Sequence, residues 1–210
     1  MSWEDAMLFC RWLTEKELKS GRLKEGEFYR LPTAEEWDQA VGIEKEKVET
    51  VSATTGAESG AGEGQVAVTE QESAVTYPWG NVWPPPFRVE NYGQKLAVDP
   101  FVHTAPVGSF APNVRGFYDL GGNVREWCMD NFSQSENLRV LRGASWRMNS
   151  ASDLRSDAVV GNASDLRFAS YGFRCVLDQS GKILSQAKKE ESVEVAASSA
   201  EQRDVAISRN

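Results

Sequence analysis

Two stretches near the start of the chain carry apolar residues at the spacing of an amphipathic helix. In the first stretch the apolar positions are Trp3, Ala6, Phe9, Cys10 and Leu13. Ser2 and Asp5 have capping-box spacing at its beginning, and Lys19 followed by Gly21 indicates its end. Because the chain starts directly on this helix cap, we expect that segments upstream of it are missing.

The second stretch, "RLPTAEEWDQAVG", has the signals of a shorter helix. Thr33 and Glu36 have capping-box spacing after Pro32, and Gly42 indicates the end of the helix. The expected inward-facing positions are Trp37, Ala40 and Val41.

Two other segments lack the apolar residues that a core needs. Residues 44–75 contain no aromatic residue and are rich in Glu, Gly, Ala, Ser and Thr, so burial cannot offset their ordering entropy. The end of the chain is similar in composition. We therefore predict that residues 1–178 form one domain with a disordered acidic insertion at 44–75. Residues 179–210 are predicted to form a flexible or weakly helical tail.

Between residues 76 and 178 the pattern is neither helical nor polar. Short aromatic runs such as "YPWG", "WPPPF" and "GFYDLGGNVREW" are separated by Gly, Pro and Asn. This pattern is typical of short strands and irregular loops packed by aromatic side chains.

The charge distribution excludes some partners. The formal net charge is −8, and residues 44–75, with seven Glu and two Lys, account for −5 of it. The rest of the chain is close to neutral, which argues against a nucleic-acid or anionic-membrane surface. The chain shows neither a transmembrane stretch nor a signal peptide, and its compartment stays open.

The cysteines and the histidine do not suggest a metal site by spacing. Cys10, Cys128 and Cys175 lie far apart, form no C-x-x-C pair, and are interpreted as small buried residues. His103 is the only histidine, which argues against a multi-histidine metal site and favours a structural role.

Several motifs, taken together and in order, resemble those of one family. They are "SWEDAMLFCRWL", "YRLPTAEEWDQA", "YPWG", "TAPVGSF", "GFYDLGGNVREWCMD", "RVLRGASW" and "YGFRCV". The chain resembles the formylglycine-generating enzyme family, also called the sulfatase-modifying factor domain. The resemblance implies an α+β, C-type-lectin-like fold with two helices, short antiparallel strands and much irregular loop.

The resemblance also tests whether the family's chemistry is retained. Its enzymes oxidise a sulfatase cysteine to formylglycine and bind Cu(I) through two cysteines that follow the Gly-Ser-aromatic motif. Counted from Ser145, those two positions hold Met148 and Asp153. A thioether and a hard carboxylate cannot replace two soft thiolates, so copper is not expected. Another branch of the family forms C–S bonds with iron that is held by histidines of a second, helical domain. With one histidine and no such domain, this chain alone is not expected to be an enzyme of that branch.

The resemblance further implies two calcium sites built from loop oxygens. The first set is Asn91, Tyr92, Asp99 and Phe101, and the second is Asp119, Gly122, Val124 and Glu126. In the alternative interpretation, Asp119 and Glu126 accept from turn amides or pair with arginines.

The polar stretch 147–171 is a candidate ligand surface. Its candidate ligand-facing residues are Arg147, Asn149, Asp153, Arg155, Asp157 and Arg167. An ordinary solvated face is the alternative. Arg142 and Arg174 are expected to pair with buried carboxylates such as Asp119, Glu126 or Asp130. Trp79 and Trp83 either form an aromatic rim or pack in the core.

These observations favour a non-oxidising, calcium-stabilised binding or regulatory module. Its expected partner is a protein, a peptide or a small polar ligand, and it could be part of a larger polypeptide. Two alternatives stay open: an active oxidoreductase that modifies a sulfatase cysteine, and an inert truncated member of the family.

Overall fold

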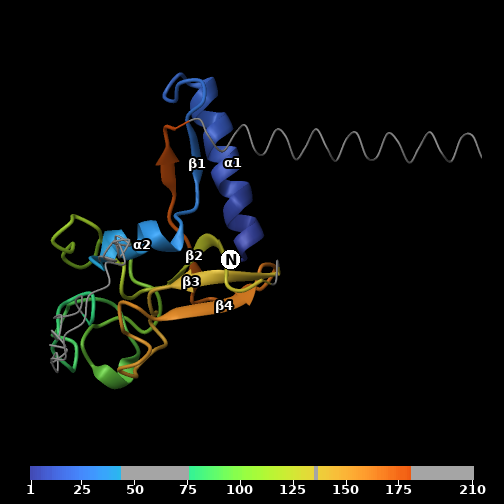
Figure 1. The fold of residues 1–210 in the computed structure, drawn as a ribbon. Helices are drawn as coiled ribbons and strands as arrows, with labels where there is room; N and C mark the ends of the chain where they lie inside the picture. The colour runs from blue at the N-terminus through green and yellow to red at the C-terminus, as the bar shows by residue number, and fades with distance from the viewer. Residues whose placement is uncertain (44–75, 135–136, 181–210) are drawn as a thin grey trace, which may run out of the picture. The chain divides into compact units, whose positions relative to one another are not determined.

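The computed structural model describes residues 1–43, 76–134 and 137–180 (Figure 1). The predicted disordered insertion at 44–75, and all of the predicted tail beyond residue 180, lie outside the described residues. The described chain forms two compact units. The first unit comprises Met1–Thr33, Glu126–Leu141 and the described residues from Gly161 onward, and the second comprises Ala34–Arg125 and Arg142–Val160.

The first unit begins with helix α1, Trp3–Lys19, and its predicted cap is confirmed. The Asp5 amide donates to Ser2 Oγ at 3.1 Å, and the Ser2 amide donates to Asp5 Oδ2 at 3.0 Å. Gly21 follows the helix with a φ of +72°, which suits the turn that ends it. Of the predicted apolar stripe, Ala6 and Cys10 are buried, whereas Phe9 is 39% exposed.

Strand β1, Phe28–Arg30, lies between α1 and strand β6, Val176–Asp178 (Figure 1). The two strands are antiparallel, with Phe28 opposite Asp178 and Arg30 opposite Val176. Arg30 Nε donates to Asp178 Oδ2 at 2.8 Å, so a buried ion pair ties the two strands together.

A four-stranded sheet has the order β4-β3-β2-β5. Its strands are β2 (Arg125–Asn131), β3 (Leu138–Arg142), β4 (Val159–Ala163) and β5 (Tyr171–Gly172). Trp127 and Cys128 on β2 are fully buried. The Trp3 indole donates to the Cys128 carbonyl at 2.9 Å, which joins α1 to this strand within the first unit.

The second unit consists mostly of loops around an aromatic core. Its regular elements are α2 (Ala34–Val41) and a short 3₁₀ turn, η1 (Gln94–Leu96). One core cluster contains Tyr77, Tyr92, Val98, Ala144 and Leu154. Trp37 and Val41 of α2 are buried, as predicted, whereas Ala40 is half-buried. Gly42 follows at a φ of +102°, which confirms the predicted end of this helix.

Asn123 connects the loops of the second unit. Its Oδ1 accepts from Asn91 Nδ2 at 3.1 Å and from the Ala105 amide at 2.9 Å. Its backbone amide donates to the Asn91 carbonyl and its carbonyl accepts from the Trp146 amide. It adopts a φ of +65°, a conformation that asparagine tolerates better than most residues.

Together, the helices, strands and long loops confirm the mixed α+β class. Within the described ranges, neither helix combines the length and the apolar character that a bilayer crossing requires.

Candidate functional site

The candidate site begins where β3 ends, at residues 142–145. Gly143 has a φ of +72°, and a Cβ there would lie 2.6 Å from the Leu120 carbonyl oxygen. The Ala144 amide donates to the Gly121 carbonyl and the Trp146 amide donates to that of Asn123. These contacts fix the backbone conformation of residues 143–146 within the second unit.

Met148 occupies the first of the two positions where the family's enzymes hold a copper-binding cysteine. Its side chain packs against the core cluster that contains Tyr92 and Leu154. Its carbonyl accepts from the Gly93 amide at 2.8 Å. The residue therefore serves as packing material between two loops.

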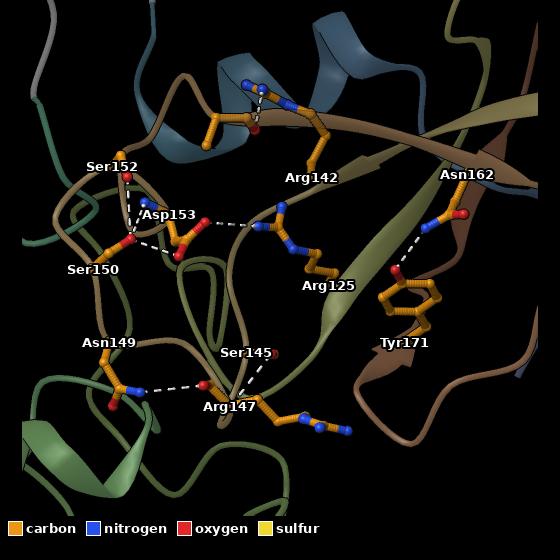
Figure 2. Close-up of polar contacts among 11 residues, drawn as sticks. Arg125, Arg142, Ser145, Arg147, Asn149, Ser150, Ser152, Asp153, Asn162 and Tyr171 are labelled. Atoms are coloured by element: carbon orange, nitrogen blue, oxygen red, sulfur yellow. Dashed lines mark hydrogen bonds and ion pairs between the residues drawn. The ribbon is translucent and has the colours of Figure 1, made fainter.

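Asp153 occupies the second position, and its carboxylate is engaged on both sides (Figure 2). Oδ2 accepts from Ser150 Oγ at 2.5 Å, while Oδ1 lies 3.7 Å from Nη2 of Arg125. Arg125 is 4% exposed, so its guanidinium is a charge held in the interior. The arrangement positions a carboxylate against a buried cation.

The other candidate ligand-facing residues of the second unit are held by local contacts. Arg147 is exposed, and its guanidinium lies over the Trp146 ring at 5.5 Å. Asn149 Nδ2 donates to the Arg147 carbonyl at 3.4 Å (Figure 2). Arg155 and Asp157 form an exposed two-bonded pair at 2.6 and 2.7 Å, and this pairing lowers the pKa of Asp157.

Arg167, the last candidate ligand-facing residue, lies in the first unit. Its Nε and Nη2 both donate to Asp5 at 2.7 Å. The guanidinium of Arg167, with bonds from Ser2, holds the pKa of Asp5 well below its usual range. Arg167 therefore has an evident role in holding the start of α1.

The first predicted calcium set lies together in one loop of the second unit. Asp99 accepts from the amides of Tyr92 and Phe101, each at 2.9 Å. Asn91 is fully buried, and no donor among the described residues reaches its Oδ1. The unpartnered Asn91 oxygen is a hard ligand of the kind that calcium takes, whereas both oxygens of Asp99 already accept from backbone amides. Within the described ranges, no group of three or more His, Cys, Asp or Glu side chains could hold a metal ion.

The second predicted calcium set is divided between the two units. Asp119, Gly122 and Val124 are in the second unit, where Asp119 Oδ2 accepts from the Gly108 amide at 2.8 Å. Glu126 is in the first unit and accepts two hydrogen bonds from Arg174, both at 2.6 Å. Both contacts agree with the alternative interpretation, in which Asp119 accepts from a turn amide and Glu126 pairs with an arginine.

The prediction that Arg142 and Arg174 pair with buried carboxylates is confirmed. Arg174 pairs with Glu126, one of the partners named from the sequence. Arg142, which is 1% exposed, instead pairs with Asp38 of α2 and also donates to the carbonyls of Ala158 and Ser156. Sequence spacing could not indicate Asp38 as its partner, because the two residues are 104 positions apart.

The structure brings together two cysteines that sequence spacing did not connect. In the first unit, the sulfur atoms of Cys10 and Cys175 are 3.6 Å apart, while Cys128 is buried on β2. The contact between the thiols raises the pKa of Cys10 and lowers that of Cys175, because Cys10 can donate to a Cys175 thiolate. Neither thiol lies at position 148 or 153.

The remaining aromatic candidates pack against other rings. Trp79 stacks on Tyr77 with ring centres 4.8 Å apart, whereas Trp83 is 40% exposed. His103 is exposed, and its ring lies against that of Trp146 at 4.8 Å. Packing therefore explains Trp79, and His103 supports Trp146.

Residues 1–179 match the model of the family described as "Sulfatase-modifying factor enzyme 1-like domain". One similar protein, from Bos taurus, is named "Inactive C-alpha-formylglycine-generating enzyme 2" and is 32% identical over 186 residues. The match covers 83% of this chain and 48% of that protein. The formylglycine-generating enzyme of Thermomonospora curvata is 27% identical, with 85% and 54% covered. The chain thus spans about half the length of these relatives.

Solved structures support the same fold. PvdO from Pseudomonas aeruginosa superposes with a TM-score of 0.53 at 22% identity, over 85% of this chain and 60% of that one. Treponema denticola variable protein 1 gives a TM-score of 0.54 at 22% identity, over 83% and 68%. The expected α+β fold of this family is therefore confirmed, and the chain belongs to the sulfatase-modifying factor, or formylglycine-generating enzyme, family.

Proposed function

We propose that this domain is a non-oxidising, calcium-stabilised binding module. The proposal rests on the two residues, Met148 and Asp153, that stand where the family's enzymes have copper-binding cysteines. Met148 fills space against the core, and Asp153 pairs with Ser150 and Arg125. Neither residue presents a thiolate.

Copper does not fit these residues, for a chemical reason. Cu(I) favours two soft sulfur anions, whereas Asp153 offers a hard oxygen and the Met148 thioether carries no charge. Asp153 would also have to leave Arg125, whose charge is shielded from water. Because the Asp153 side chain is 46% exposed and its oxygen lies 3.7 Å from the guanidinium, losing this contact costs less than breaking a fully buried pair.

Two named relatives indicate that the family includes both classes. The Thermomonospora curvata relative is named as a formylglycine-generating enzyme, and the Bos taurus relative is named as an inactive one. On the residues at 148 and 153, we place this chain with the inactive class.

Oxygen consumption tests the non-oxidising part of the proposal. The full chain is incubated with Cu(I), a thiol reductant and a cysteine-containing sulfatase peptide, and the Thermomonospora curvata enzyme serves as the positive control. We expect no peptide-dependent oxygen uptake and no formylglycine by mass spectrometry. Turnover would contradict the proposal. Loss of that turnover in Cys175→Ser would then assign it to the thiol pair in the first unit.

A double substitution, Met148→Cys with Asp153→Cys, provides the matched gain of function. Both proteins carry Cys175→Ser in this comparison, because the adjacent thiols of Cys10 and Cys175 are themselves soft ligands for Cu(I). In that background the double variant should bind Cu(I) in competition with a chromophoric chelator, whereas the chain without the two added cysteines should not. Equal binding by both proteins would show that copper is held elsewhere.

The calcium part of the proposal rests on the loop that contains Asn91 and Asp99. A ligand that binds only the native state stabilises it by about 2.7 kcal/mol at a hundred times its dissociation constant. We therefore expect calcium to raise the melting temperature of the parent chain, and magnesium at the same concentration to raise it less. Asn91→Ala should abolish this shift, and Arg155→Ala should keep it. An unchanged melting temperature in the parent would contradict the calcium site.

A further inference from the structure

One cleft of the second unit lies beside the polar stretch and has an unusual lining. It has a volume of about 240 Å³ and is formed by Gly93, Gln94, Lys95, Val102, Trp146, Arg147 and Asn149. The lining has two cationic side chains and no carboxylate, although the chain as a whole has a formal charge of −8. The cleft is therefore positive by composition in a domain that is otherwise close to neutral.

The two cations of the cleft are available to a ligand. Lys95 and Arg147 are exposed. Among the described residues neither forms an ion pair, and Arg147 instead lies over the face of Trp146. The nearby arginine–carboxylate pairs, Arg155 with Asp157 and Arg125 with Asp153, show that other charges of this unit are matched.

Two polar atoms of the lining residues are shielded from solvent and lack a hydrogen-bond partner in the part of the chain that the structure describes. One is Trp146 Nε1, which can only donate, and the other is Asn149 Oδ1, which can only accept. Shielded polar atoms without a partner are costly in a native structure, and a bound ligand is one way to satisfy them. The required ligand has both an acceptor and a donor.

We propose that this cleft binds the carboxylate of an acidic peptide side chain. The carboxylate would face the exposed Lys95 and Arg147. Because Trp146 Nε1 and Asn149 Oδ1 are shielded in the empty cleft, binding would turn these two side chains, so that the indole N–H donates to the carboxylate and Asn149 Oδ1 accepts from a peptide N–H. Charge-assisted hydrogen bonds of this type are roughly twice as strong as neutral ones. The inference rests on the proposed binding function and names the ligand chemistry for it.

The test uses three probes of similar size with the full chain: N-acetyl-glutamate N-methylamide, the matching glutamine derivative, and glutarate. Binding is followed by the NMR shift of the Trp146 indole N–H, which is assigned by its loss in Trp146→Phe. The glutamate derivative should bind roughly tenfold more tightly than the glutamine derivative, because only it carries the charge. Glutarate should bind more weakly than the glutamate derivative, because it lacks the N–H donor.

Two variants localise the effect. Lys95→Gln combined with Arg147→Gln should weaken binding of the glutamate derivative roughly tenfold, while Arg155→Gln, an exposed arginine outside the cleft, should not. Both altered cleft residues are exposed, so the melting temperature should stay close to that of the parent. Raising the salt concentration from about 50 to about 500 mM should also weaken binding.

Each outcome decides a part of the proposal. Equal affinity for the glutamate and glutamine derivatives, or no binding of either, overturns the carboxylate site. Equal affinity for glutarate keeps the carboxylate site and overturns a peptide as its source. Since these measurements contain no copper and consume no oxygen, their failure is distinct from turnover in the oxygen assay.

Discussion

The second unit contains two adjacent stretches that use polar side chains in opposite ways. Residues 142–145 are buried, and their polar groups contact partners far away in the sequence, such as Asp38 and Gly121. Residues 147–157 are mostly at least partly exposed, and their side chains mainly contact neighbours two or three positions away. The difference separates a stretch that builds the scaffold from a stretch whose side chains are available for recognition.

The largest effect is expected at Arg142. Arg142→Ala would remove the guanidinium that faces the buried Asp38 carboxylate, together with the donors to the carbonyls of Ala158 and Ser156. Breaking such a pair from one side costs about 3–5 kcal/mol of unfolding free energy. Urea denaturation measures this loss. If the alanine variant does not fold, Arg142→Lys, which keeps the charge but loses the planar contacts, should give a smaller loss in the same direction.

The next effect tests Leu154, a fully buried apolar residue that anchors the exposed stretch. Leu154 is 1% exposed and packs with Tyr77, Tyr92 and Val98. Leu154→Ala should cost about 3 kcal/mol through lost burial and the cavity that remains. Leu154→Met, which nearly conserves volume, should cost less than about 1.5 kcal/mol. Equal losses in thermal or urea unfolding would show that the stretch is not anchored there.

A third prediction extends the comparison to a buried carboxylate of the first unit. Hydrogen bonds from Ser180, and then from Arg30, lower the pKa of Asp178 to about 2. Because the folded pKa lies below the unfolded value of about 3.9, Asp178 stabilises the fold fully above about pH 4. That contribution, about 2 kcal/mol, is lost as the pH falls to about 2.

Asp178→Asn should therefore lower the unfolding free energy at neutral pH by about 2 kcal/mol and flatten its dependence on pH between about 4 and 2. Urea titrations at several pH values measure both effects. An unchanged slope in this range would show that Asp178 does not carry this part of the acid sensitivity.

The smallest effect is expected in the exposed stretch itself. Arg155→Ala removes an ion pair with Asp157 in which both side chains are about half exposed. Solvent screens such a pair, so the cost should be below about 1 kcal/mol. The pKa of Asp157, which this pair lowers, should rise toward its ordinary value, as NMR titration would show. A loss as large as that of Arg142→Ala would remove the distinction between the two stretches.

Features that depend on residues a few positions apart, such as helix caps and helix ends, could be predicted from the sequence. The capping box of Ser2 and Asp5 spans three positions, and the glycines that end both helices follow directly, so these elements could be located from the sequence. The ordered series of motifs also identified the family and its fold.

Contacts between distant positions could not be predicted in the same way. The Cys10–Cys175 contact joins residues 165 positions apart, and the Arg142–Asp38 pair joins residues 104 apart. Nothing in the spacing selects one buried carboxylate over another as the partner of a given arginine. The cleft beside Trp146 was missed for the same reason, since Lys95 became part of the site only when residues 93–95 folded beside residues 146–149.

Asn123 has a consequence for engineering. It hydrogen-bonds Asn91, Ala105 and Trp146, and these contacts hold the loops on either side of the cleft in place. Asn123 itself does not line the cleft. A combinatorial library that randomises residues 147, 149, 150 and 152 while preserving Asn123 and Leu154 would therefore vary the polar stretch without changing the residues that hold the loops together. The domain has the layout of a scaffold for selecting new binders.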